Sequence, residues 1–404
     1  MAGKWRASTW GEEISLEYGK ALRGHDESKG RYRVFGANGP IGWTSEPLVQ
    51  GPGVILGRKG AYRGVQYSRE PFFVIDTAYY VVPKSDLDMR WLYYAIKHYK
   101  LGEVDDGSPI PSTTRAAVYL LDLDMPPIDE QRVIAHILGT LDDKIELNRR
   151  MNETLEAMAQ ALFKSWFVDF DPVRAKAEGR DPGLPKPIAN LFPSRFMDSE
   201  LGEIPDGWEV RGLDEIAHFL NGLALQKYPA EDGRWLPVIK IAQLRTGNTN
   251  GADRASADLE SEYVVRDGDI LFSWSGSLEC VLWAGGPGAL NQHLFKVTSV
   301  NYPRWFCYLG IHQHLDDFRH IAAGKATTMG HIQRHHLSDA KVLVPPRELL
   351  TAMSTFFEPM VESKWHRAVA SRALAALRDT LLPKLISGEL RVHAAPPFTK
   401  EFTT

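Results

Sequence analysis

The sequence predicts an α+β protein with two mixed α/β globular domains, two long antiparallel coiled-coil helices between them, and a pseudo-two-fold internal repeat. Three observations predict this class. A proline pair occurs twice, as Pro126-Pro127 and Pro345-Pro346, with a shift of 219 residues from position 126 to position 345. Each pair precedes roughly 40 residues of helical periodicity. Each pair also follows a region rich in glycine, aromatic and β-branched residues, which is typical of strands and turns. The chain therefore contains two similar units, each a globular part followed by a long helix.

Composition narrows the class of protein. The 404 residues leave room for two or three domains, and 44% hydrophobic with 24% charged residues is typical of ordinary globular proteins. No apolar run approaches membrane-spanning length and the N-terminus does not resemble a leader, so we expect a cytoplasmic protein. Cys280 and Cys307 are not part of a C-x-x-C pair, which excludes a disulfide framework and a four-thiolate zinc site. A net charge of −4 means that any nucleic-acid surface must be local.

The first half divides into a globular domain, residues 1–127, and a spacer helix, residues 128–170. Strand-like runs lie at 54–56, 72–75 and 78–82, and a short helix is expected at 91–99. In the spacer helix, alternating spacings of four and three residues indicate the seam of a coiled coil. The seam residues are Ile134, Leu138, Leu141, Ile145, Asn148, Asn152, Leu155, Ala159, Leu162 and Trp166.

The second half repeats this plan after a connecting loop at residues 171–200, where several prolines stop the helix. The second globular domain covers residues 201–346, the distal spacer helix 347–390, and a C-terminal tail 391–404. Seam residues recur with the same shift of 219 at Met353, Phe357, Met360, Leu374, Leu381 and Leu385. Matching seams predict that the helices pack on each other and run antiparallel, and a helix of roughly 40 residues spans about 60 Å.

Polar residues interrupt the seam at Asn148 and Asn152, and their counterparts are Arg367 and Ser371. Two interpretations stay open. Such groups can fix the register of a helix pair at some cost in stability, or the helices splay there and admit water. A second open question is whether the large apolar residues near the helix ends pack inside the protein or contact partner proteins. They are Phe163, Trp166, Phe167, Leu382, Leu385 and Ile386.

Several segments resemble one known family. They are 126–135 (PPIDEQRVIA), 141–152 (LDDKIELNRRMN), 161–172 (ALFKSWFVDFDP), 202–208 (GEIPDGW) and 381–390 (LLPKLISGEL). The first three resemble the central conserved region of specificity subunits of type I restriction-modification systems. The fourth resembles the usual entry to their second target-recognition domain, and the last resembles their distal conserved region. The resemblance covers nearly the whole chain and is strongest in the helices.

This resemblance implies a DNA-binding protein of phage defence. Family members read a bipartite DNA target with one target-recognition domain per half-site, and the paired helices set the length of the unspecified spacer. They organise two modification subunits, which methylate adenine with S-adenosylmethionine, and two restriction subunits, which use ATP and magnesium. The resemblance therefore implies that this chain is no enzyme and holds no cofactor or metal of its own.

The sequence has no recognisable catalytic motif, which agrees with what the resemblance implies. A G-x-x-x-x-G-K-[ST] phosphate loop does not occur. Asp171-Pro-Val-Arg174 is the nearest approach to the Asn/Asp-Pro-Pro-aromatic motif that holds a flipped base, and it lacks the second proline and the aromatic residue. Carboxylates at Asp206 and Glu209 are too closely spaced for a nuclease site. The histidines at 312, 314, 331, 335 and 336 either bind zinc or form a polar surface near DNA, and the neighbouring Lys325 and Arg334 favour the surface.

Candidate DNA-binding residues are side chains that can donate to base edges or phosphates from loops. In the first domain the glycine-flanked loop at 57–64 is the best candidate, although an ordinary solvated turn is an alternative. The first-domain candidates are Asn38, Arg58, Lys59, Tyr62, Arg63, Ser112, Thr113 and Arg115. The second-domain candidates are Ser273, Ser275, Ser277, Lys325, Thr327, Thr328, His331, Gln333 and Arg334.

The loop at 273–277 takes the place of the loop at 57–64 but has no cation, so we expect two different half-sites and an asymmetric target. Two alternatives remain. One is the recognition subunit of a related methylation-based defence complex without a translocating nuclease. The other is a coiled-coil scaffold whose globular domains bind peptide or carbohydrate instead of DNA.

Overall fold

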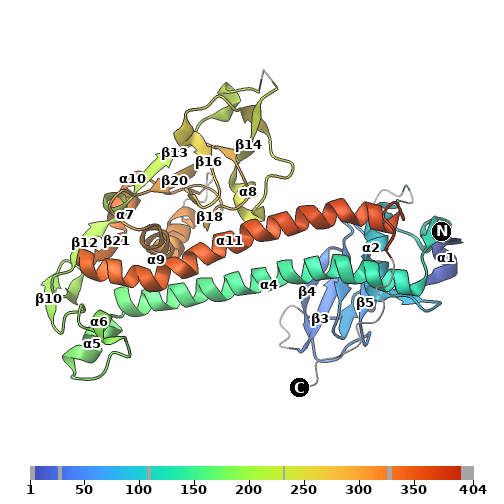
Figure 1. The fold of residues 1–404 in the computed structure, drawn as a ribbon, viewed down its shortest axis with the longest axis horizontal. Helices are drawn as coiled ribbons and strands as arrows, with labels where there is room; N and C mark the ends of the chain where they lie inside the picture. The colour runs from blue at the N-terminus through green and yellow to red at the C-terminus, as the bar shows by residue number, and fades with distance from the viewer. Residues whose placement is uncertain are drawn as a thin grey trace. The chain divides into compact units, whose positions relative to one another are not determined.

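A computed structural model describes residues 5–25, 30–105, 107, 111–230, 233–324 and 330–392. The chain forms two units, one made of residues 1–144 and 374–404 and the other of residues 145–373. Each unit contains one globular domain and part of each long helix, as the ribbon shows (Figure 1). Within the described residues, no helix combines the length and the apolar character that a membrane span requires.

The first unit holds the first globular domain. Its elements are β1 (Arg6–Thr9), α1 (Trp10–Glu13), β2 (Ile14–Tyr18), β3 (Tyr32–Gly36), β4 (Gly39–Thr44), β5 (Gly53–Gly57), β6 (Val65–Ser68), β7 (Phe72–Val74), β8 (Ala78–Pro83), α2 (Met89–His98), η1 (Leu101–Glu103), α3 (Arg115–Tyr119), β9 (Asp122–Met125) and the start of α4 (Ile128–Phe167). The strands form a four-stranded sheet in the order β2-β8-β5-β6, a three-stranded sheet in the order β4-β3-β7, and the pair β1-β9.

The second unit begins within α4. Its further elements are α5 (Asp171–Ala177), α6 (Lys186–Ala189), β10 (Phe196–Ser199), β11 (Gly202–Pro205), β12 (Glu209–Gly212), α7 (Leu213–Ile216), β13 (His218–Asn221), η2 (Leu225–Lys227), β14 (Trp235–Ile239), α8 (Ile241–Thr246), β15 (Arg254–Ser256), η3 (Ser261–Tyr263), β16 (Val264–Val265), β17 (Ile270–Ser273), β18 (Cys280–Leu282), β19 (Gly288–Leu290), β20 (Leu294–Thr298), α9 (Arg304–Ala323), α10 (Arg334–Asp339), β21 (Lys341–Val344) and α11 (Arg347–Ile386).

The sheets confirm the internal repeat. The order β2-β8-β5-β6 of the first domain returns as β13-β20-β17-β18 in the second, with the same antiparallel pairings. The smaller sheet also returns, because β3 lies between antiparallel β4 and parallel β7 just as β14 lies between antiparallel β15 and parallel β19. Each domain is closed by a strand pair, β1-β9 or β12-β21, that ends directly before a proline pair. The proline pairs therefore mark the start of each long helix.

The long helices pack along the predicted seam. Ile134 and Leu138 are fully buried in the core of the first unit, together with Leu385 of α11. In the second unit, Phe163 and Trp166 of α4 share a core with α11 and with α9. Five of the six large apolar side chains near the helix ends are therefore core residues, while Leu382 is partly buried and packs against the core of the first unit.

Contacts within each unit give the helix direction. In the second unit Asn148 donates to the Ser371 hydroxyl at 3.0 Å, and Asn152 donates to the Lys364 carbonyl at 3.0 Å. In the first unit Arg378 donates to Asp142 at 2.6 Å. Residue numbers rise along α4 as they fall along α11, so the helices run antiparallel as predicted. The direct asparagine contacts favour a role in register over splayed helices.

The connecting segment 171–200 is more ordered than the predicted loop. It contains the helices α5 and α6 and the strand β10, which pairs with β11. Its Phe192 is buried in the core of the second unit and stacks edge-on against Trp166 at 5.7 Å. Proline 172 sits in the first turn of α5, where its missing N–H has no partner to lose. Reading the prolines only as helix stops therefore overlooked a helix start.

Candidate nucleic-acid interface

In the first domain, two arginines lie against one exposed tyrosine. Tyr18 ends β2 and keeps 48% of its surface exposed. The Arg58 guanidinium lies 4.9 Å and the Arg115 guanidinium 4.2 Å from the centre of its ring. Both guanidinium groups also lie 5.9 Å from the ring of Tyr79, which is buried beside Tyr18. Positive charge and exposed aromatic surface are the combination that binds nucleic acid.

Two loops meet at this cluster. The backbone of Thr113 donates to the Arg58 carbonyl at 2.9 Å, and Lys59 and Ser112 form an isolated antiparallel bridge. Arg58 is steadied by a hydrogen bond from Nη1 to the Asp76 carbonyl at 2.8 Å. The structure therefore brings together two of the segments that the sequence predicted separately.

The side chains of the loop at residues 57–64 differ in exposure and in their contacts. Tyr62 is 79% exposed and Lys59 is exposed, so both are free to meet a ligand. Arg63 instead turns inward, because its guanidinium donates to the Gly102 carbonyl at 2.7 Å and to the Gly60 carbonyl at 3.2 Å. Arg63 thus shapes the loop that presents Arg58 and Lys59.

The second domain repeats this geometry with different residues. Ser275 and His331 form the same isolated antiparallel bridge as Lys59 and Ser112. Arg334 lies 5.8 Å from the ring of Phe295, as Arg115 lies against Tyr79. Trp274 takes the sequence position of Arg58, and its indole donates to the Gln292 carbonyl at 3.1 Å. We call the two equivalent sites the first and second recognition clusters.

Three predicted contact residues are corrected by burial. Thr113 and Ser273 are fully buried and Ser275 is 3% exposed. The Thr113 hydroxyl donates to the Val104 carbonyl at 3.0 Å, and the Ser273 hydroxyl donates to the Ser277 carbonyl at 2.8 Å. The Ser275 hydroxyl lies 3.0 Å from Nδ1 of His293. These side chains hold the loops in shape and cannot touch a base in this conformation.

The remaining candidates lie at the surface or outside the described residues. Asn38, Ser277, Gln333 and Arg334 are exposed, while Arg58, Ser112, Arg115 and His331 are partly exposed. Lys325, Thr327 and Thr328 lie outside the described residues. Sequence reasoning missed Tyr18, whose signal would have been an aromatic residue at the end of a strand.

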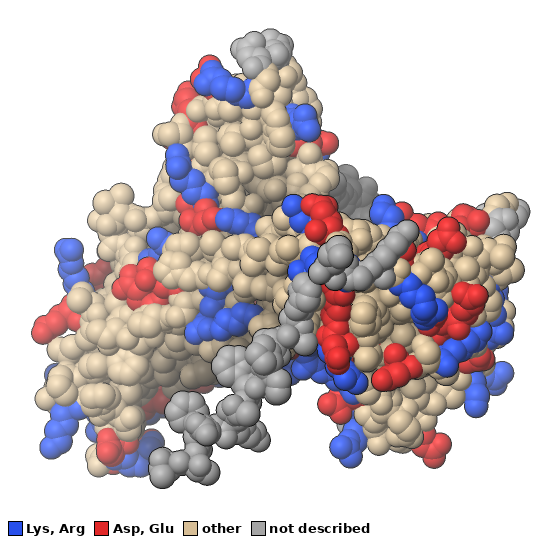
Figure 2. All heavy atoms as spheres, turned by 45° about the vertical axis from the view of Figure 1, so that its right-hand side comes forward, with Lys and Arg blue, Asp and Glu red and all other residues tan. Residues whose placement is uncertain are grey.

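The first cluster is a local group of positive charges. The first cluster gathers Arg58, Lys59 and Arg115, and the one ionic contact between these cations and a described carboxylate joins Arg115 to Glu17 at 3.3 Å. On the face drawn in Figure 2, basic and acidic side chains are interspersed, and neither sign covers a large area. An anionic ligand would therefore find no extended area of positive charge on that face.

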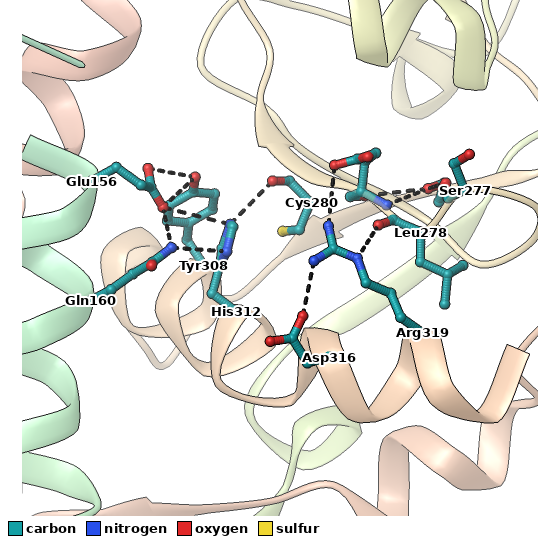
Figure 3. Close-up of polar contacts among 11 residues, drawn as sticks. Glu156, Gln160, Ser277, Leu278, Cys280, Tyr308, His312, Asp316 and Arg319 are labelled. Atoms are coloured by element: carbon teal, nitrogen blue, oxygen red, sulfur yellow. Dashed lines mark hydrogen bonds and ion pairs between the residues drawn. The ribbon is translucent and has the colours of Figure 1, made fainter. Parts of the chain in front are cut away.

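Helix α9 supports the loop at residues 273–277, which belongs to the second recognition cluster. Nε of Arg319 donates to the Leu278 carbonyl at 3.1 Å, and the same guanidinium forms ion pairs with Glu279 at 3.4 Å and Asp316 at 3.0 Å. His312, about two turns earlier on α9, lies 3.1 Å from the Cys280 carbonyl through Nε2. Figure 3 shows these contacts side by side, so α9 fixes the hairpin that carries residues 273–277.

A partly buried ionic group joins α9 to both long helices. Lys364 of α11 forms a hydrogen bond and ion pair with Glu156 of α4, and the Tyr308 hydroxyl donates to Glu156 at 3.0 Å. Burial would raise the pKa of the Glu156 carboxyl, but the charge of Lys364 and the hydrogen bonds from Lys364 and Tyr308 outweigh it and hold this pKa below its ordinary value. Burial lowers the pKa of His312, which favours its neutral form. The cluster thus holds one carboxylate and one ammonium inside the second unit.

Breaking this pair should destabilise the second unit. Lys364→Met keeps the aliphatic stem but leaves Glu156 without its cation, and we expect a loss of roughly 1–3 kcal/mol in the free energy of unfolding. The double variant Glu156→Gln with Lys364→Met removes both charges and should recover most of that loss. Urea unfolding of the full chain measures both. Equal stability of the single and double variants would contradict an energetic role for the charge pair.

The sequence left open whether five of the histidines in residues 312–336 bind zinc or form a polar surface. Among the residues that the structure describes, no group of three or more His, Cys, Asp or Glu side chains is arranged to hold a metal ion. His312 and His314 each form a hydrogen bond with a backbone carbonyl, at 3.1 Å to Cys280 and 2.8 Å to Lys341. Both therefore have structural partners within the second domain.

Comparison with known proteins places these features in a family. The family described as "Type I restriction modification DNA specificity domain" matches residues 5–157 and again residues 205–361. A type I restriction enzyme HindI specificity subunit from Haemophilus influenzae is 26% identical over 379 residues, covering 79% of this chain and 81% of that protein. The MjaIX specificity subunit from Methanocaldococcus jannaschii is 27% identical over 338 residues, covering 78% of this chain and 72% of its own.

Solved structures show the same fold. The S subunit of a type I restriction-modification system from M. genitalium matches with a TM-score of 0.59 at 15% identity, over 96% of this chain and 97% of that chain. The two family matches coincide with the two repeated domains, and each match runs into one of the long helices.

Proposed function

Because this chain belongs to the type I restriction-modification DNA specificity family, we propose that it reads a bipartite, asymmetric DNA target with one domain per half-site. The observation that carries the proposal is the pair of recognition clusters, which share one loop geometry but carry different side chains. Arg58 and Lys59 in the first domain stand where Trp274 and Ser275 stand in the second. Side chains with different donors and shapes select different base edges.

The half-sites would be held apart by the paired helices. α4 and α11 each contain 40 residues, which corresponds to about 60 Å of helix. A continuous antiparallel pair resists bending and compression better than a loop does, so it suits a spacer of fixed length.

We further propose that all chemistry resides in partner proteins. Two modification subunits would supply S-adenosylmethionine-dependent adenine methylation, and two restriction subunits would supply ATP- and magnesium-dependent translocation and cleavage. This chain would supply the DNA contacts and the surface on which those subunits assemble in the cytoplasm, where the DNA substrate lies.

Matched arginine variants test the assignment of half-sites. Arg115 and Arg334 occupy equivalent positions in the two clusters, 219 residues apart from 115 to 334. Arg115→Gln should relax base selection in one half of the methylated motif, and Arg334→Gln in the other half. Each loss should correspond to about 1–3 kcal/mol of discrimination. The measurement is the motif methylated in cells that carry the chain and its modification subunit.

Each variant serves as the control of the other. The assignment is wrong if either substitution alters both halves of the motif, or if neither alters any base. Binding of duplex DNA that is insensitive to salt would contradict the DNA-reading function as a whole and would favour a protein scaffold.

A further inference from the structure

Each domain carries one exposed arginine stacked on one exposed tryptophan in its smaller sheet. In the first domain the Arg33 guanidinium lies 4.3 Å from the centre of the Trp43 ring. In the second the Arg254 guanidinium lies 4.3 Å from the Trp235 ring. The two indoles have 41% and 42% of their surface exposed. We call these the sheet pairs.

The sheet pairs sit on equivalent sheets that are otherwise without charge. Arg33 is the one charged residue in the strands β3, β4 and β7, and Arg254 is the one charged residue in β14, β15, β16 and β19. A single cation recurs in both sheets, and in both it is placed on a tryptophan.

Both domains have an arginine–tryptophan pair, but the two residues lie on different strands in each domain. In the first domain the arginine lies on the inner strand β3 and the tryptophan directly opposite on the edge strand β4. In the second the tryptophan lies on the inner strand β14 and the arginine on the edge strand β15, in diagonal register. The arginine and the tryptophan have therefore exchanged strands between the two domains. Duplication of one ancestral arginine or tryptophan position does not by itself explain why both domains have the pair.

The charge of each sheet pair is available to a ligand. Among the described residues, no carboxylate forms an ion pair with Arg33 or Arg254, and neither guanidinium donates a hydrogen bond within the protein. The indole face orients the guanidinium and leaves its N–H groups free. Such a planar, oriented donor suits bidentate contact with an anionic oxygen pair, as in phosphate.

Hydrogen bonds join each sheet that carries a sheet pair to the loop of the recognition cluster in the same domain. In the first domain Gly64 of the recognition loop donates to the Ala37 carbonyl in the turn between β3 and β4, at 2.9 Å. In the second, Asn291 donates to the Ile239 carbonyl at the end of β14, at 3.3 Å, and the next residue, Gln292, accepts from Trp274. Each sheet is thus continuous with the loop that carries its recognition cluster, which is the surface that we propose binds DNA. This continuity favours DNA over a protein partner as the occupant.

We propose that Arg33 with Trp43, and Arg254 with Trp235, bind the sugar–phosphate backbone of DNA beside the two half-sites. Each guanidinium contacts a phosphate, and each exposed indole packs on the adjoining deoxyribose. The contact is independent of sequence, so it adds affinity at both half-sites without selecting bases. The inference rests on the proposed DNA-reading function and adds a backbone anchor to it.

The test measures how DNA binding by the full chain depends on salt. The probe is a pool of random-sequence duplexes, because a backbone contact needs no target. The slope of log affinity against log salt concentration changes by about 0.9 for each phosphate contact that is lost. Arg33→Gln and Arg254→Gln should each reduce the slope by about one unit, and the double variant by about two. Near physiological salt, each single variant should bind about three- to tenfold more weakly.

Three controls show whether an effect comes from the position of the arginine, from its charge or from unfolding of the variant. Arg180→Gln removes the same charge from an exposed turn in the connecting segment, and its slope should stay at the wild-type value. Arg33→Lys keeps the charge and should restore most of the slope while losing part of the affinity. Circular dichroism melts confirm that each variant remains folded.

The outcomes are distinct. If wild-type protein binds the duplex pool but the double variant matches Arg180→Gln in slope and affinity, the backbone anchor is refuted while DNA reading stands. If the double variant keeps its DNA affinity but loses a modification subunit on co-purification, the sheet pairs contact protein and the proposal is also refuted. If wild-type protein shows no salt-sensitive binding, DNA reading itself fails and the anchor fails with it.

Discussion

A chain in which both long helices are lengthened by two heptads should direct methylation of a motif whose spacer is longer by about six base pairs. Fourteen helical residues add about 21 Å, and each base pair rises by about 3.4 Å. The insertions belong after Lys144 in α4 and after Ala373 in α11, where the two units divide and both helices run on without interruption. Whole heptads keep Leu141 and Ile145 on one seam. Sequencing of methylated DNA from the host measures the spacer.

An unmatched insertion is the control for this experiment. Two heptads added to α4 alone would slide its seam against α11 and break contacts such as Asn148 with Ser371, so methylation should fall or disappear. An unchanged spacer in the matched variant would show that the helices do not set the distance between half-sites.

Phe357→Ala should be among the most destabilising single substitutions in the second unit. Phe357 is fully buried on α11, stacks on Trp305 of α9 at 4.4 Å and meets Trp166 of α4 edge-on at 5.4 Å. Removing its ring leaves a cavity where three helices meet, which costs about 4 kcal/mol. For a domain of this size the melting temperature should fall by about 10 °C. Differential scanning calorimetry of the full chain measures the loss.

Met158→Ala is the matched control, because Met158 lies on α4 in the same unit but is 55% exposed. Its cost should stay below about 0.5 kcal/mol. Similar melting temperatures for the two variants would mean that the aromatic junction of α4, α9 and α11 does not hold the unit together.

The helices were predictable from sequence because their physics is local and periodic. A seam repeats every few residues, so the burial of Ile134 and Leu138 followed from spacing alone. The predicted boundaries after each proline pair also correspond to the first residues of α4 and α11. The segment at 171–200 was harder, because a proline in the first turn of a helix, as in α5, and a proline that ends a helix have the same sequence signal.

The recognition clusters were only partly predictable because they depend on contacts between distant segments. The loops carrying Arg58 and Arg115 were identified, but their meeting at Tyr18 required the pairing of β2 with β8. Serine and threonine are equally common in exposed turns and in buried turn hydrogen bonds. Sequence therefore gave no means to separate Ser273, which is buried, from Ser277, which is exposed.

The most direct test of the central claim is the motif methylated when this chain is expressed with its modification subunit in a host that lacks other adenine methylation. Two different recognition clusters on a fixed helical spacer predict one bipartite, asymmetric motif with a spacer of constant length. A palindromic or contiguous motif, or methylation that does not depend on this chain, would contradict the account.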